Sequence, residues 1–134
     1  MRDAYSNITV RETLAIATRT ASVNGTGVDR YASGAAYQDA MIVVHTGTIT
    51  DGTHAVDVQD SDDNSTFGSV AAAQLQGSEP SVVAADDNKV FVVGYKGSKR
   101  YLRVAIAASG TTSGGVYGAT IVLSNPRVAP AVHA

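Results

Sequence analysis

The strongest constraint on the fold of this chain is its excess of residues that branch at Cβ. Val, Ile and Thr make up 37 of the 134 residues, whereas Leu and Met together make up 6. A branched Cβ restricts the side chain in a helix and packs well on the pleated surface of a strand. Because 44% of the residues are hydrophobic and only 16% are charged, the chain also has enough apolar surface for one core. The composition therefore predicts a single all-β domain.

Two apolar runs, residues 40–44 and 90–93, have the character of strands that are buried on both faces, and we expect the first to be a central strand. Residues 101–107 instead alternate, with Leu102, Val104 and Ile106 predicted to point to the core. Turn signals separate about seven to nine such strands. This spacing favours an antiparallel β-sandwich or barrel with jelly-roll-like character.

The ends of the chain are predicted to be extended arms on this sandwich. Residues 1–17 are compatible with a strand, a short helix over 11–17 or an arm, and we favour an arm. The sandwich domain is expected over 18–125, and an apolar tail with Pro130 over 126–134. Within the domain, the turn signals at 24–27 and at 50–53 each predict a hairpin, because Asn and Gly accept positive φ at low cost.

Charge and cysteine content exclude several classes of function. The formal net charge is −2 and the chain has no Cys, so disulfides, thiolate metal sites and a thiol nucleophile are excluded. An acidic balance gives no general attraction to nucleic acid or to an anionic membrane. Residues 1–20 are too polar for a secretory signal, and we expect synthesis in the cytoplasm.

Motifs for catalysis or metal binding are weak. His45, His54 and His133 are widely spaced, so a metal role is not favoured, although a hairpin could bring the first two together. Asp60, Asp62 and Asn64 resemble the opening of a calcium loop, but Ser65 and Ala71 stand where such a loop needs Gly and Glu. A polar surface loop is the favoured interpretation, with weak calcium binding left open. Nucleophile-elbow and phosphate-loop spacings are absent, so we predict no enzyme, no cofactor and no metal.

The order of the charged residues is more informative. Residues 51–88 hold eight acidic side chains and no Lys or Arg, whereas residues 89–103 hold five basic side chains and no Asp or Glu. Adjacent strands of opposite charge can pair within one sheet. Alternatively, an acidic edge and a basic edge can meet between neighbouring copies of the chain and set their orientation. The sequence leaves both interpretations open.

Small apolar residues also occupy positions where a solvent-facing strand normally carries polar ones. Alanines at 71–73, 84–85, 105 and 107–108 add to the two apolar runs. Together they indicate more apolar surface than one thin sandwich can hide. Either the terminal segments fold back over it, or sister subunits or a larger host surface cover it.

Five segments give the chain a resemblance to small structural proteins encoded among the head genes of tailed phages and prophages. They are residues 1–7, 49–54, 58–63, 94–103 and 125–127, and the resemblance covers nearly the full length. It implies a virion protein, a decoration or cement protein on the outer capsid surface. Proteins of this kind are commonly β-rich and often trimeric. These segments are not catalytic motifs, and the resemblance assigns no functional residue.

We therefore predict a non-enzymatic virion protein that binds the capsid surface as an oligomer, with a trimer favoured and the major capsid protein as partner. Two alternatives remain: a head-completion or tail component, and a carbohydrate-binding β-sandwich for host adsorption. The second is disfavoured because sugar platforms use aromatic faces and the chain has no Trp. The candidate interface residues are Tyr5, Ile8, Val10, Lys96, Lys99, Arg100, Arg103, Val128 and Val132.

Overall fold

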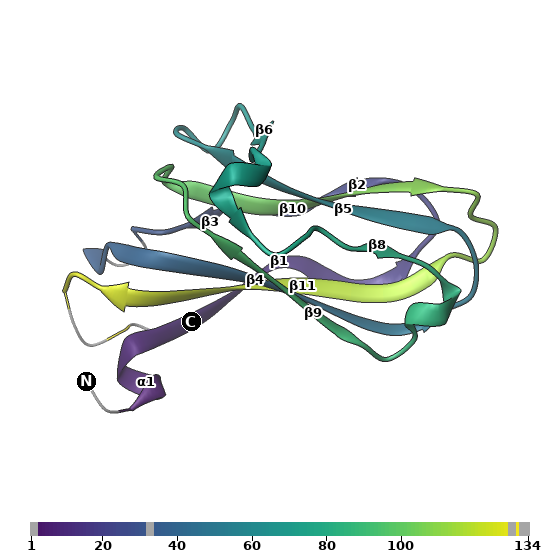
Figure 1. Ribbon diagram of the computed structural model, residues 1–134, viewed down its shortest axis with the longest axis horizontal. Helices are drawn as coiled ribbons and strands as arrows, with labels where there is room; N and C mark the ends of the chain where they lie inside the picture. Colours follow the sequence, from purple (N-terminus) through teal and green to yellow (C-terminus); the bar gives the residue numbers. More distant parts are fainter. Residues whose placement is uncertain (1–2, 32–33, 129–130, 132–134) are drawn as a thin grey trace.

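The computed structural model describes residues 3–31, 34–128 and 131, and it confirms an all-β sandwich (Figure 1). The helix α1 Ala4–Asn7 and the 3-10 turns η2 Ala72–Gln74 and η3 Ala84–Asp86 accompany the strands. The long strands are β1 Ile8–Arg19, β4 Tyr37–Ile49, β5 Thr53–Ser61, β9 Val90–Tyr95, β10 Tyr101–Ser109 and β11 Gly115–Pro126. The two-residue strands are β2 Val23–Asn24, β3 Val28–Asp29, β6 Gly68–Ser69, β7 Leu75–Gln76 and β8 Ser81–Val82.

Two antiparallel sheets form the layers of the sandwich. The five-stranded sheet has the order β1-β11-β4-β9-β7, and the second sheet has the order β2-β10-β5-β6, with β3 beside β10 and β8 beside β5. If β2 and β3 count as one strand position, β6 and β8 count as another, and the two-residue strand β7 is left out, the eight positions run 1-8-3-6 in one layer and 2-7-4-5 in the other. This nesting of two Greek keys is the jelly-roll arrangement.

The core lies between the layers and is made by the alternating inward side chains of both sheets. Ile42, Val93 and Ile121 are opposite one another in the five-stranded sheet and are almost fully buried. Leu102, Val104 and Ile106 of β10 face them and are also buried, which confirms the alternation predicted for this strand. Full burial of such side chains stabilises the fold by about 1.5–3 kcal/mol each.

The expected N-terminal arm over 1–17 is corrected by the structure from Ile8 onward. Residues Ile8–Arg19 form β1, which pairs antiparallel with β11 at the edge of the five-stranded sheet. Leu14 and Thr13 of this strand are buried, so the segment belongs to the sandwich. The loose apolar spacing arises because two register shifts interrupt the pairing between Glu12 and Ala17, and they break the period of two on which a strand assignment depends.

The predicted hairpin at 24–27 is also corrected. β2 and β3 both pair with β10, so the chain continues along one neighbour instead of turning back. None of residues 24–27 has a positive φ. Gly25 is needed for close approach: a Cβ there would lie 2.5 Å from the carbonyl oxygen of Thr13 and 2.7 Å from that of Val104.

The turn at Asp51 and Gly52 exists, but it does not make a hairpin. Gly52 has a φ of +83°, and the turn carries the chain from β4 in one sheet to β5 in the other. The Asp51 carboxylate accepts hydrogen bonds from the backbone N–H groups of Thr112, Ser113 and Gly114, which ties this turn to the loop before β11. Local turn chemistry was predicted correctly, whereas the sheet that receives the chain depends on distant pairing.

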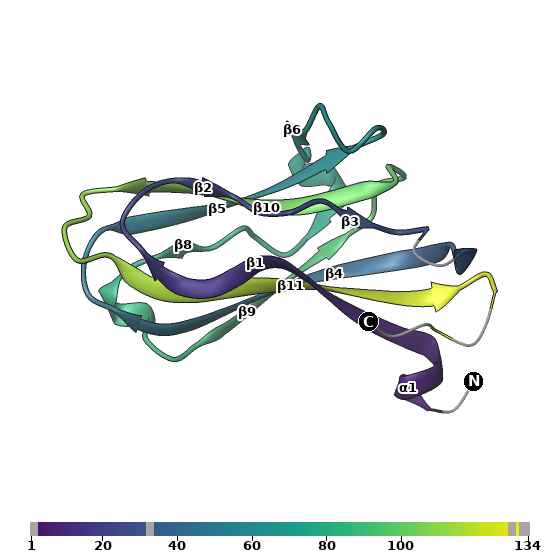
Figure 2. The same cartoon turned by 180° about the vertical axis from the view of Figure 1, so that it is seen from behind.

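The described terminal residues lie together at one end of the sandwich (Figure 2). The Arg127 and Val128 N–H groups donate to the carbonyl oxygens of Ala36 and Ala35, and the Ala131 N–H donates to that of Ser6. Ala131 is buried against the core cluster. The tail predicted over 126–134 thus packs back on the domain where the structure describes it.

Candidate functional site

The outer face of the five-stranded sheet is the most distinctive surface of the molecule. Its strand register aligns Val10, Val122 and Met41 in one row across the sheet. The next row contains Thr120 between Glu12 and Val43, and it continues to Val92 on β9. Within the described chain, no helix or strand lies over this face (Figure 1).

Apolar side chains, exposed or partly buried, make up most of this face. We call it the outer apolar face, defined by Val10, Ile16, Met41, Val43, Val90, Val92 and Val122. Val90 and Val92 are 57% and 51% exposed, and Ile16 is 67% exposed. Single exposed apolar residues are ordinary, but a contiguous group on one face indicates an interaction surface.

The sequence predicted that the two apolar runs are buried on both faces. The structure corrects this, because each run is buried on one face only. In 40–44 the buried and exposed positions alternate, with Met41 37% exposed between buried Ala40 and Ile42. In 90–93, Val93 is buried whereas Val90 and Val92 are exposed. The uninterrupted apolar sequence indicated burial correctly for one face only. On the other face, the residues that the sequence assigned to the core are exposed or half-buried.

The outer face of the second sheet is polar by comparison. Arg103 donates a hydrogen bond to Gln59, which in turn donates to Asp57. Ser69 donates to the same Asp57 carboxylate from β6. The Arg103 guanidinium also lies 4.1 Å from the centre of the Phe67 ring. These side chains satisfy one another in contact with water, so the outer face of the second sheet is more polar than that of the five-stranded sheet.

A shallow hollow of about 150 Å³ lies within the outer apolar face. Ile16, His45 and Gly118 are among the residues that line it. A Cβ on Gly118 would lie 2.5 Å from the Ile16 side chain and 3.0 Å from the Leu14 carbonyl oxygen. The glycine thus lets β1 approach β11 closely.

The structure separates the histidines that the sequence considered as a metal pair. His45 lies on the outer apolar face and is exposed. His54 is fully buried between the sheets, where Nδ1 is 2.9 Å from the Tyr117 hydroxyl and Nε2 is 3.1 Å from the Asp51 carbonyl oxygen. Desolvation raises the pKa of Tyr117. His133 lies outside the described residues, and among those described no group of three His, Asp or Glu side chains could hold a metal ion.

Two acidic side chains, Asp60 near the end of β5 and Asp63 in the loop after it, bind partners within the chain. Asp60 is buried, accepts a hydrogen bond from the Tyr95 hydroxyl at 2.8 Å and lies 3.8 Å from Lys99 Nζ. Desolvation, reinforced by this hydrogen bond, raises the pKa of Tyr95 to about 12. Asp63 accepts hydrogen bonds from the backbone N–H groups of Ser65 and Thr66. Asp60 therefore turns inward, away from the position that a calcium loop requires.

Asp63 gives a pH prediction. The backbone N–H groups of Thr66 and Ser65 and the Ser61 hydroxyl stabilise its ionised form and lower its pKa from 3.8 to about 2. Because the folded pKa is below the unfolded one, this stabilisation is complete above the unfolded pKa and is lost as the pH falls toward about 2. We expect the free energy of unfolding to fall between about pH 4 and about pH 2, and to fall less steeply in Asp63→Asn. Urea unfolding at stepwise lower pH measures both slopes, and equal slopes would contradict this role.

The predicted interface residues divide into separate regions. Val10 lies on the outer apolar face, where it is 50% exposed, and Ile8 at the start of the same strand is half-buried. Tyr5 and Val128 are exposed near the two ends of the chain. Lys96, Lys99 and Arg100 lie on the segment between β9 and β10, whereas Arg103 belongs to the outer face of the second sheet. Val132 is outside the described residues.

The opposite charges of the two sequence segments pair within the chain at two points. Lys89 lies 3.2 Å from Asp86, and Lys99 contacts Asp60. Other acidic side chains cap backbone groups instead: Asp87 accepts from the Ile49 N–H and Glu79 from the Val58 N–H. Desolvation raises the pKa of Glu79. Several acidic side chains of residues 51–88 thus hold backbone groups or lysines of the same chain in place. This favours pairing within the chain over pairing between neighbouring copies.

Comparison with protein-family models finds no matching family, and a search of curated proteins finds no matching relative. None of the helices in the described residues is long and apolar enough to cross a membrane. The assignment of the candidate site therefore rests on the structure alone.

Proposed function

We propose that this chain is a non-enzymatic structural protein of a tailed-phage particle, a decoration protein that assembles as an oligomer on the outer capsid surface. The single observation that carries the assembly part is the outer apolar face, because a charge-poor sheet surface of this kind is unusual on a monomer. The phage assignment comes from the sequence resemblance over residues 1–7, 49–54, 58–63, 94–103 and 125–127. A jelly roll is compatible with capsid proteins and with lectins alike, so the fold alone does not choose between them.

The occupant that best fits the outer apolar face is a second copy of the chain. Obligate interfaces between identical subunits are more apolar than interfaces between transient partners. Glu12 on the edge strand β1 and His45 on β4 also line this face, and the residues that define it are all apolar. Packing of this face against a sister subunit would complete the burial that the two runs at 40–44 and 90–93 require. A trimer remains the favoured oligomer from the resemblance.

The capsid contact is proposed for the terminal residues. Tyr5 is 75% exposed and Val128 is 62% exposed, and the described parts of both terminal segments meet where Ala131 donates to Ser6. An oligomer would present several copies of this end to the capsid, so that weak single contacts add up through avidity.

Cosedimentation with empty heads, assembled from the major capsid protein of the same phage, tests the function. We expect saturable binding of the full-length chain and loss of binding in the double variant Tyr5→Ser and Val128→Ser. The matched control is Val83→Ser, since Val83 is also an exposed apolar residue but lies beside η3. Absence of the wild-type chain from the head pellet at every concentration would contradict the decoration role. Labelling at a vertex or on the tail would instead assign the head-completion or tail alternative.

A further inference from the structure

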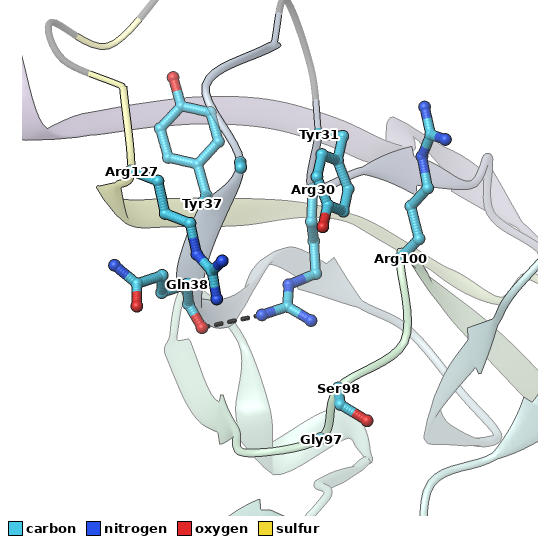
Figure 3. Close-up of a pocket in the computed structure, with 9 residues that line it drawn as sticks. Arg30, Tyr31, Tyr37, Gln38, Gly97, Ser98, Arg100 and Arg127 are labelled. Carbon is cyan, nitrogen blue, oxygen red and sulfur yellow. Dashed lines mark hydrogen bonds between the residues drawn. The ribbon is translucent and has the colours of Figure 1, made fainter.

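A second candidate site lies at the end of the sandwich, away from the outer apolar face. A hollow of about 270 Å³ is lined by arginines from three parts of the chain, Arg30, Arg100 and Arg127, together with Tyr37, Gln38 and Ser98 (Figure 3). We call it the arginine hollow. In Figure 3 the guanidinium groups of Arg30 and Arg127 point into the same side of it, beside the Gln38 carbonyl oxygen, whereas Arg100 points away.

Arg30 is a buried cation with neutral partners. The residue is only 8% exposed, and its guanidinium donates to the carbonyl oxygens of Lys99 and Gln38, both at 2.8 Å. Its guanidinium carbon lies 5.4 Å from the centre of the Tyr95 ring. Its Nε is buried without a hydrogen-bond partner in the described structure. Backbone carbonyls orient this group, but they supply no full negative charge, and a buried charge without one is costly.

The other two arginines, Arg100 and Arg127, differ in whether a carboxylate balances their charge. Arg100 donates two hydrogen bonds to the Asp29 carboxylate, at 2.8 and 2.9 Å, so its charge is already balanced. The ion pairs among the described residues include neither Arg30 nor Arg127. The backbone of Arg127 is held by its N–H bond to Ala36, which places the exposed side chain at the hollow. The positively charged side chains of Arg30 and Arg127 therefore both line the arginine hollow, and no carboxylate among the described residues pairs with either of them.

We propose that the arginine hollow binds an oxyanion, a phosphate or carboxylate group, held between the guanidinium groups of Arg30 and Arg127. Guanidinium groups bind both kinds of oxyanion through paired hydrogen bonds, because the spacing of their N–H donors matches that of two oxygens. Ser98 also lines the hollow, and in Figure 3 its hydroxyl points away from the two guanidinium groups. An anion here would remove the repulsion between Arg30 and Arg127 and offset the burial of the Arg30 charge.

Nuclear magnetic resonance titration of the full chain tests the site with sodium phosphate and, separately, with sodium glutarate. Sodium chloride at matched ionic strength controls for screening. We expect saturable shifts of the Gln38, Gly97 and Ser98 amides. Arg127→Gln should weaken binding about tenfold, since it removes one charged hydrogen-bonding group. Arg19→Gln is the matched control: it removes the same charge from the far end of β1, where Arg19 donates to the Ala15 carbonyl oxygen.

The outcomes of the titrations distinguish a phosphoryl ligand, a carboxylate ligand and the absence of a specific site. Saturation by phosphate alone supports a phosphoryl ligand, and saturation by glutarate alone supports a carboxylate, such as an acidic side chain of a partner. Arg30→Lys keeps the charge but loses the paired donors, so weaker binding in this variant supports the paired contact. Shifts that equal those in chloride, or equal affinity in Arg127→Gln and the wild type, would overturn the proposal.

Discussion

Val92→Glu is expected to convert the assembled protein into monomers. Val92 lies in the middle of β9 on the outer apolar face and is 51% exposed, so a glutamate there is solvated in the single chain. In an oligomer that packs this face against a sister subunit, the same carboxylate would be buried without a partner. Such a burial costs about 3–5 kcal/mol, which weakens association by about two to four powers of ten. Light scattering after size exclusion measures the mass directly.

Two further variants make this test specific. Ala107→Glu places the same charge on the polar outer face of the second sheet, where Ala107 is exposed, and it should leave the oligomer intact. Val92→Leu keeps an apolar side chain and should also assemble. Dissociation by Ala107→Glu as well, or an unchanged mass in Val92→Glu, would show that the outer apolar face is not the subunit contact.

His54→Ala is expected to lower the free energy of unfolding by about 2–5 kcal/mol. The His54 ring is fully buried and links the two sheets, because β5 carries the histidine and β11 carries Tyr117. Its ring centre is 5.0 Å from that of Tyr117 in an edge-on arrangement. The substitution leaves a cavity and removes the hydrogen-bond partner of the buried Tyr117 hydroxyl.

Urea unfolding at a fixed protein concentration measures this loss, since the stability of an oligomer depends on concentration. His45→Ala is the matched control. His45 lies on the proposed subunit contact, so both substitutions are made in the Val92→Glu background, which is expected to be monomeric. His45 is exposed in the single chain, and its removal there should change the free energy of unfolding by less than about 0.5 kcal/mol. Equal effects of the two substitutions would contradict the assignment of His54 as the buried link between the sheets.

The sequence predicted the fold class and several strands because those properties are local. Leu102, Val104 and Ile106 alternate cleanly with other residues, and the structure buries all three. Positive φ at Gly52 follows from the Asp-Gly pair. The role of Gly25 could not be predicted, because it depends on the approach of Thr13 and Val104, which are distant in sequence.

The candidate site was only partly predictable for a similar reason. A run such as residues 90–93 is equally apolar whether its second face meets another layer of the same chain or an open surface. Sequence periodicity reports what a side chain is suited to contact, and not which chain supplies the contact. The arginine hollow was beyond prediction, since Arg30, Arg100 and Arg127 are brought together only by the pairing of the sheets.

The mass of the wild-type chain in solution tests the central claim most directly. If sister copies cover the outer apolar face, light scattering will give a multiple of the 13.7 kDa chain, with three copies favoured, and the mass will hold on moderate dilution. A mass of 13.7 kDa across the whole accessible concentration range would contradict the account.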